Sequence, residues 1–166
     1  MVSDTGKRKP FNPEDRAGKR KPFSQQLFDD NDSAARQAVT DYLMATEDCS
    51  VTHNPDPYSI DLLVRSGLED ERGVEVEVKR VWRGKHFPWK TVQLPERKKK
   101  FLKLVDSGKL GRIDYWVLNA ELTHAWVIPG ELLNRMLPEE VPNRYVARGE
   151  KFYQIPISLC KLVELA

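Results

Sequence analysis

Apolar side chains recur along the chain with two spacings, one typical of helices and one typical of strands. Over residues 29–45 the helical spacing dominates, and Asn31 or Asp32 is expected to cap the helix that it predicts. The apolar stripe of this helix consists of Ala35, Ala38, Val39, Tyr42 and Leu43. Downstream, short apolar stretches separated by turn residues predict strands at 49–54, 58–64, 73–82, 112–120, 123–130 and 151–155.

The segments between these strands complete the predicted fold. Residues 83–94 mix aromatic and basic residues without a regular period, which predicts an irregular loop. Pro95 is expected to open a second helix that ends at Gly108. A short helix is expected at 130–136 and a helical turn at 156–165. The order of helix, three strands, helix and two strands predicts a mixed α/β fold, in which helices flank a central β-sheet.

The strand GVEVEVKR, residues 73–80, carries a row of charges. Its valines share one face, so Glu75, Glu77 and Lys79 share the other. Two explanations are open from this stretch alone. The charged face is either solvated, with ion pairs between strands, or it is half of a metal site.

Length and composition indicate one intracellular domain. The chain has 166 residues, of which 40% are hydrophobic and 31% are charged, and this size allows a buried core. Two cysteines, Cys49 and Cys160, are too few for a disulfide framework and favour a reducing, cytoplasmic location. The three histidines lack the spacing of a zinc site, and no apolar run is long enough to cross a membrane.

The net charge of +2 conceals two basic regions. Residues 80–112 contain eleven Lys and Arg residues and two acids, and residues 1–23 contain seven and three. The N-terminal region repeats GKRKPF, and its polar sequence predicts a flexible arm over 1–26 ahead of a domain over 27–166. Both regions suit a polyanion such as nucleic acid, although a solubilising tail explains the arm equally well.

Asp61 makes the charged row a candidate metal site. Asp61 lies in the apolar run 58–64, where a charge is unfavourable unless it serves a function. Its strand and the strand of Glu77 are expected to be neighbours in a hairpin. Two adjacent carboxylates repel unless a cation lies between them, and oxygen ligands suit Mg²⁺ or Mn²⁺. Lys79 points to the same side, where its ammonium can hold a water molecule or neutralise a phosphate.

The stretches YSIDLLV and GVEVEVKR, within this order of elements, resemble the PD-(D/E)XK nuclease superfamily. The resemblance spans about residues 33–128 and implies a restriction-endonuclease-like αβββαβ core, DNA as substrate and a divalent metal as cofactor. It implies that Asp61 and Glu77 are metal ligands together with the backbone carbonyl of Val78. Lys79 corresponds to the catalytic lysine.

The literal Pro-Asp pair of the family name stands at Pro55 and Asp56. Asp56 lies between two prolines in a turn, where aspartate is common for local reasons. Asp61 is therefore the preferred ligand, and Asp56 is kept as an accessory candidate.

Other accessory candidates follow from position. Glu75 shares the face of Glu77, although an exposed strand position explains it as well. Some members of the superfamily add an acid from the first helix, here Asp41 or Glu47, and some place a polar residue where Gln93 stands.

The basic segment is expected to bind the DNA backbone through Arg80, Arg83, Lys85, Lys90, Arg97, Lys98, Lys99 and Lys100. Residues 97–100 crowd the first turn of the second predicted helix, where a bound phosphate would offset their repulsion from the helix dipole. Trp89 is expected to pack in the core.

Together these observations predict a metal-dependent DNA endonuclease that is structure-directed or weakly sequence-specific. The resolvase, homing or restriction, and phage-repair types all fit, and many relatives act as homodimers. The alternative is a non-enzymatic nucleic-acid-binding protein that uses the basic 80–112 surface. A third reading is an adaptor whose basic arm binds an acidic partner.

Overall fold

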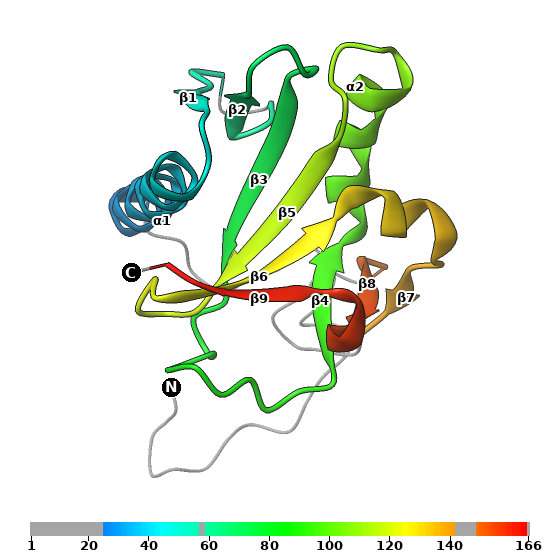
Figure 1. The fold of residues 1–166 in the computed structure, drawn as a ribbon. Helices are drawn as coiled ribbons and strands as arrows, with labels where there is room; N and C mark the ends of the chain where they lie inside the picture. The colour runs from blue at the N-terminus through cyan, green and yellow to red at the C-terminus, as the bar shows by residue number, and fades with distance from the viewer. Residues whose placement is uncertain (1–24, 57–58, 142–148, 166) are drawn as a thin grey trace, which may run out of the picture.

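The structure is a computed structural model that describes residues 25–56, 59–141 and 149–165, with side chains described from Ser33 onward. It is a mixed α/β fold with two sheets. The helix α1 (Gln25–Thr46) lies beside the larger sheet (Figure 1). Within the described residues, no helix is long and apolar enough to cross a membrane.

The larger sheet has six strands in the order β1-β2-β3-β5-β6-β9. Their bounds are β1 Ser50–His53, β2 Leu62–Arg65, β3 Arg72–Val78, β5 Ile113–Leu118, β6 His124–Pro129 and β9 Lys161–Glu164. All neighbours are antiparallel except β3 and β5, which run parallel and place Glu75 beside Tyr115. A parallel pair requires a long crossover, which here lies between Val78 and Ile113.

The crossover builds a second layer. It contains β4 (Thr91–Pro95), the 3-10 helix η2 (Glu96–Leu102) and the short helix α2 (Lys103–Asp106). The second sheet has the order β4-β8-β7, with β7 at Glu139–Glu140 and β8 at Lys151–Pro156. Two more 3-10 helices, η3 (Gly130–Arg135) and η4 (Ile157–Leu159), lie in the connections.

Each face of the larger sheet covers its own apolar core. The residues named below are each at most 5% exposed. The core on the α1 face includes Ala35, Val39, Leu43, Leu62, Val64, Val74, Val76 and Trp116. The core between the sheet and the second layer includes Ile60, Trp82, Val92, Leu94, Tyr115 and Ile155. The two cores show that an apolar layer packs on each face of the larger sheet.

The predicted fold class is confirmed, and so are the strands at the positions of β1, β3, β5, β6 and β8. The start of the first helix was predicted wrongly. The helix α1 already begins at Gln25, so Asn31 and Asp32 lie inside it and do not cap it. Most of the predicted arm, residues 1–24, lies outside the described residues.

Three other predictions are corrected. The expected loop at 83–94 contains most of β4, because Val92 and Leu94 alternate into the core. The expected helix from Pro95 is mostly the 3-10 helix η2, and Pro95 itself ends β4. The expected helical turn at 156–165 is confined to η4, after which β9 pairs with β6.

Candidate functional site

The acidic row of β3 lies on the face turned away from α1. Val74 and Val76 pack in the α1 core, so the alternation of the strand turns Glu75 and Glu77 toward the second layer. Gly73 precedes them on the same face, where a Cβ atom would lie 3.0 Å from Ile60 Cγ1. Ile60 therefore packs on this face, whereas Leu62 and Val64, farther along the chain in β2, pack in the α1 core.

Asp61 lies immediately before β2 and is bonded to β3 by hydrogen bonds that involve a side chain. Its Oδ2 accepts the backbone N–H of Val76 at 2.8 Å, and its own backbone N–H donates to Glu75 Oε2 at 2.9 Å. Leu62 pairs with Val74, so the register continues to place Asp61 opposite Glu75. The cross-strand neighbour of Asp61 is thus Glu75, and not Glu77 as the sequence suggested.

Glu75 is the most enclosed of these carboxylates, with 2% of its surface exposed. Burial raises its pKa to about 8, the Lys98 ammonium opposes that rise, and the charge of Asp61 adds to it. The explanation of Glu75 as an exposed strand residue is therefore wrong. It lies at the centre of the carboxylate group.

Lys98 bridges the row from the second layer. Its Nζ lies 2.9 Å from Glu75 Oε1 and 3.0 Å from Glu77 Oε1, with 17% of its side chain exposed. Burial alone would lower the pKa of Lys98, but Glu77 and Glu75 together raise it. The Tyr115 hydroxyl donates to the backbone carbonyl of Lys98 at 2.6 Å, which fixes this part of η2 above β5. The sequence placed Lys98 among the expected DNA contacts and did not indicate its ion pairs with Glu75 and Glu77.

Lys79 follows Glu77 on the same row but has a different neighbour. Its Nζ lies 4.9 Å from the centre of the Trp89 ring, and burial lowers its pKa. Trp89 contacts Phe87 edge-on and is 39% exposed, so the prediction that it packs in the core is wrong. Within the described residues, Lys79 makes no ion pair with Glu77.

Asp41 in α1 and Glu47 just after its end are separated from this group by the sheet. Asp41 is exposed and accepts a hydrogen bond from Gln37 at 2.8 Å. Glu47 pairs with Arg72 at 2.8 Å. Because α1 covers the opposite face, the structure does not bring Asp41 or Glu47 to Glu75.

Asp56 and Gln93 also lie apart from the row. Asp56 is exposed in a turn, where its backbone N–H donates to Asn54 Oδ1 at 3.1 Å. Gln93 is exposed on β4, and its amide contacts Gln154 Oε1 at 3.5 Å. Neither residue has a described contact with Asp61, Glu75 or Glu77.

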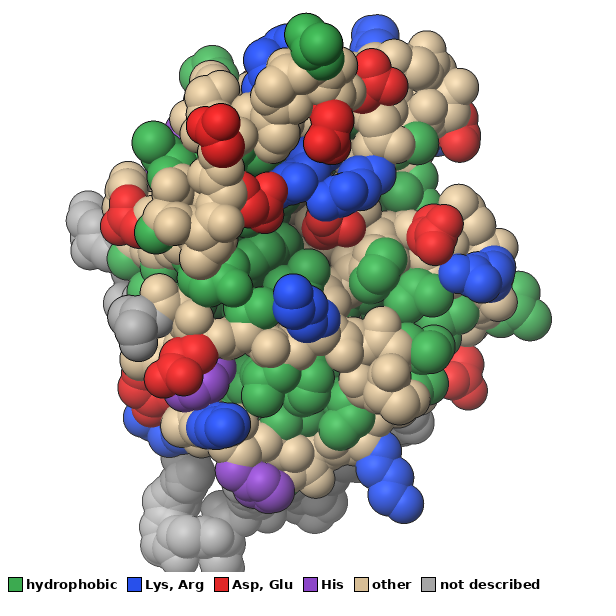
Figure 2. All heavy atoms as spheres, in the orientation of Figure 1, with side chains coloured by type: hydrophobic (Ala, Val, Ile, Leu, Met, Phe, Trp, Pro, Cys, Tyr) green, Lys and Arg blue, Asp and Glu red, His purple; other side chains and the backbone are tan. Residues whose placement is uncertain are grey.

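The eight predicted DNA-binding residues do not share one environment. Arg80, Lys85 and Lys90 are exposed, whereas Arg97 pairs with Glu150 at 2.7 Å. Other members are Arg83, 3.9 Å from Glu121, and Lys100, 5.1 Å from the centre of the Phe101 ring. On the face shown in Figure 2, Lys and Arg side chains are interspersed with Asp and Glu. The argument from a helix dipole loses its basis, because η2 is a seven-residue 3-10 helix.

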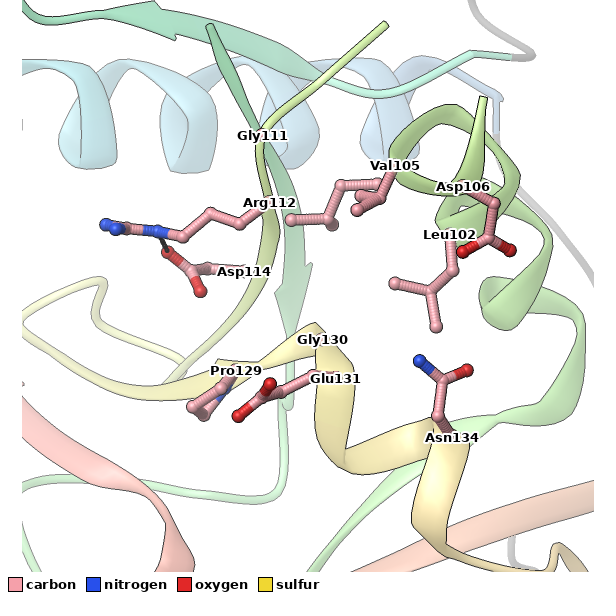
Figure 3. A pocket seen from close by; sticks show the side chains of 11 residues that line it. Leu102, Val105, Asp106, Gly111, Arg112, Asp114, Pro129, Gly130, Glu131 and Asn134 are labelled. Carbon is pink, nitrogen blue, oxygen red and sulfur yellow. Dashed lines mark hydrogen bonds and ion pairs between the residues drawn. The ribbon is translucent and has the colours of Figure 1, made fainter. Parts of the chain in front are cut away.

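A hollow of about 530 Å³ lies apart from the carboxylates, between α2, β5 and η3. Figure 3 shows Arg112 turned toward Asp114 at one end, where the two side chains lie 3.3 Å apart. Asp106 and Asn134 lie at the other end (Figure 3). The lining includes none of the acidic row, so the size of a hollow does not identify the candidate site in this fold.

The carboxylates have the donor chemistry of a magnesium site. Asp61, Glu75 and Glu77 offer only oxygen ligands, which suit hard divalent cations. Among the described residues, Asp61 accepts a hydrogen bond through Oδ2, and Glu77 contacts Lys98 through Oε1. As the side chains now lie, no group of three or more His, Cys, Asp or Glu residues in the described chain has the spacing to hold a metal. The donors therefore fit such an ion in kind, and the cation now between Glu75 and Glu77 is an ammonium.

No protein-family model matches the chain, and no curated protein matches it. Among solved structures, the chain is similar to Hjc, a Holliday junction resolvase from the archaeal hyperthermophile Archaeoglobus fulgidus. The alignment covers 77% of this chain and 85% of that chain, with a TM-score of 0.50 and 10% sequence identity. At this identity the likeness concerns the fold. It confirms the restriction-endonuclease-like fold that the resemblance implied.

Proposed function

We propose that this chain is a metal-dependent deoxyribonuclease that hydrolyses phosphodiester bonds. The observation that carries the proposal is the enclosed carboxylate group, in which Glu75 contacts both Asp61 and Lys98 on the inner face of the sheet. A buried carboxylate with a raised pKa beside other titratable groups is typical of functional sites. The similarity in fold to Hjc, a Holliday junction resolvase, supports DNA as the substrate.

Asp61 and Glu77 are the proposed metal ligands, together with the backbone carbonyl of Val78. The geometry adds Glu75 to this set, because it is the carboxylate that Asp61 contacts. Mg²⁺ or Mn²⁺ bound there would lower the pKa of a bound water and offset charge on the phosphate. The protein's own part is to hold the oxygen ligands in place through the Val76 and Asp61 backbone amides.

Lys79 is the proposed catalytic lysine. Its ammonium is half-buried beside the exposed Trp89, and burial lowers its pKa. A lysine at this position can orient the attacking water or offset the charge that develops on the phosphate. The exposed Arg80, Lys85 and Lys90 follow it along the chain and are proposed to contact phosphates of the DNA backbone.

The substrate is proposed to be DNA recognised by its structure or with weak sequence preference. Phosphate contacts position a protein on DNA, whereas base contacts specify sequence. The exposed basic residues beside Lys79 suit the first kind of contact, and resolution of a four-way junction is the leading possibility because of the fold. A homodimer is proposed as the active assembly, since a junction offers two symmetric strands to cut.

The first experiment is a cleavage assay with Mg²⁺ or Mn²⁺ on labelled duplex, single-stranded, nicked, flap and four-way-junction DNA. Wild type, Asp61→Asn and Lys79→Ala would be compared on every substrate. Metal-dependent cutting that both variants lose would support the nuclease. Cutting by the wild type that neither substitution affects would contradict the assigned site.

The second candidate is a nucleic-acid-binding protein without catalytic activity. It is favoured by the contacts of Lys98, which already neutralise part of the charge of Glu75 and Glu77. Uncut DNA across the whole panel, with tight and salt-sensitive binding, would support this candidate.

A further inference from the structure

Lys98 occupies a position unlike that of its neighbours in the basic run 97–100. Arg97 pairs with Glu150, and Lys100 lies over the ring of Phe101. Only Lys98, among the described basic residues, forms ion pairs with the carboxylates of β3, and it forms two of them. Its side chain is largely enclosed, so these contacts are shielded from water.

Two features hold the ammonium in place. Tyr115 lies beside Glu75 in the register of β3 and β5, and its hydroxyl donates to the Lys98 carbonyl. The backbone of Lys98 is therefore tied to the strand that neighbours the acidic row. In addition, Glu75 is buried, and an ionised carboxylate in such a place needs a nearby cation.

One ammonium does not balance the charge of Asp61, Glu75 and Glu77 when all three are ionised. Lys98 contacts Glu75 and Glu77, while Asp61 contacts Glu75 only through its own backbone N–H. A divalent cation would compensate more of this charge, and it would compete for the Glu75 and Glu77 oxygens that now accept from Lys98. Mg²⁺ and an ammonium ion repel each other at such short range, so the two do not share these oxygens.

We propose that Lys98 is a built-in counter-cation of the carboxylate site, which a divalent metal ion displaces when it binds. The inference rests on the proposed function, because it assumes that the site binds metal. The long aliphatic stem of lysine lets the ammonium move while Tyr115 keeps the backbone of η2 fixed. Metal binding then releases a positive charge beside the site, where a phosphate of the substrate can use it.

The test measures the chemical accessibility of the Lys98 amine in the full-length wild-type protein, without DNA. The protein is treated with a small acylating reagent at pH 8, with and without saturating Ca²⁺ or Mg²⁺, and labelling of each lysine is quantified by mass spectrometry. Saturation is established by calorimetric titration of the same protein with the same metal. Half-buried Lys99, which is next in η2, serves as the internal control.

We expect metal to increase labelling of Lys98 by about tenfold, because two ion pairs that hold and shield its amine are lost. Labelling of Lys99 should not change. If Lys98 stays protected while calorimetry shows the metal bound, the displacement is disproved and the proposed function stands. If calorimetry shows no metal binding at all, the metal-dependent function fails, and this inference fails with it.

A pair of variants provides a second readout. Lys98→Met should bind Ca²⁺ at least about tenfold more tightly than wild type, because the metal no longer competes with an ammonium. Lys99→Met should bind like the wild type. Equal affinities for Lys98→Met and wild type would overturn the inference. The labelling of the wild type does not depend on whether Lys98→Met folds.

Discussion

The two faces of β3 are built from alternate residues of one short strand, yet they differ in almost every physical respect. Val74 and Val76 face α1 in a closed apolar core. Glu75 and Glu77 face the second layer, where Lys98 bridges them. The α1 face contributes to stability through burial of apolar area, whereas the other face holds charges that burial alone would destabilise. The two faces thus separate apolar burial from enclosed charge, and each prediction below tests that contrast.

The largest expected effect is a loss of cleavage when a charged side chain of the acidic face is replaced by an uncharged one. Asp61→Asn and Glu77→Gln should each reduce the rate of metal-dependent cleavage by about a thousandfold, because each removes the charge of a proposed metal ligand. Rates would be measured on the preferred substrate in the panel, with DNA affinity measured in parallel. Asp114→Asn is the matched control, since Asp114 lies beside Val74 on the α1 side. A comparable loss in the control would remove the distinction between the two faces.

Lys79 is expected to have the next largest effect. Lys79→Ala should lower the cleavage rate by about a hundredfold and leave DNA affinity close to that of the wild type. Single-turnover kinetics and a binding titration in Ca²⁺ separate the two quantities. A Lys79→Ala protein that cuts as fast as wild type would show that its assigned role is wrong.

The stability of the protein should change with pH because of Glu75 on the acidic face. Because the pKa of Glu75 is raised to about 8 in the folded protein, from an ordinary value near 4.5, the folded state holds this proton more tightly than the unfolded state does. The stabilisation is complete below the ordinary pKa and is lost as the pH rises through about 8. The free energy of unfolding should therefore fall between pH 5 and 8, by an amount on the order of a few kcal/mol.

Urea unfolding of wild type and Glu75→Gln at several pH values measures this dependence. The glutamine variant should show a clearly smaller fall, because its side chain does not titrate. Asp114, whose pKa burial also raises, remains in both proteins and contributes equally to both curves. Parallel curves for the two proteins would contradict the assignment to Glu75.

A substitution on the apolar face should lower the stability of the protein and leave its cleavage rate unchanged. Val76→Ala should lower the free energy of unfolding by about 1 to 3 kcal/mol, because it leaves a cavity beneath α1. Its cleavage rate per folded molecule should be close to that of wild type, since the Val76 backbone N–H that binds Asp61 is retained. A hundredfold loss of cleavage in this variant would mean that the two faces do not act separately.

The smallest effect is expected from the exposed basic residues. The double variant Lys85→Gln and Lys90→Gln should bind DNA with a weaker dependence on salt. The slope of log affinity against log salt concentration should be smaller in magnitude by about 1 to 2, because each lost phosphate contact reduces it by a little under one unit. The exposed Arg135, on η3 and outside the 80–112 segment, provides the control as Arg135→Gln. Equal slopes for all three proteins would exclude Lys85 and Lys90 from the DNA contact.

Sequence analysis predicted the acidic row because alternation within one strand is a local property. The positions of Glu75 and Glu77 on one face of β3 follow from the period of two alone. Burial of Glu75 does not, because it depends on Asp61 and on Lys98, which approach from other elements. The position of Lys98 had no signal in the sequence, where it is one of four consecutive basic residues.

The sequence contained information that could have prevented two wrong predictions, the loop at the position of β4 and the cross-strand neighbour of Asp61. Val92 and Leu94 alternate with Gln93, which is the pattern of the strand β4, but the aromatic and basic residues before them favoured a loop. Gly73 marks a close approach from another segment, and Ile60 occupies that space. The register of β2 and β3, in which Leu62 pairs with Val74, places Asp61 opposite Glu75.

The bond from the Val76 amide to the Asp61 carboxylate makes one backbone proton a reporter on the site. In nuclear magnetic resonance spectra, the chemical shift of that proton would follow the charge on Asp61, and its exchange with deuterium would follow the opening of the end of the β2–β3 hairpin. Substitution of Lys98 or protonation of Glu75 would reach this proton through Glu75 and the Asp61 backbone, whereas a metal bound by Asp61 would act on its carboxylate directly. A single assigned resonance can thus distinguish events at the carboxylates that an activity measurement would merge.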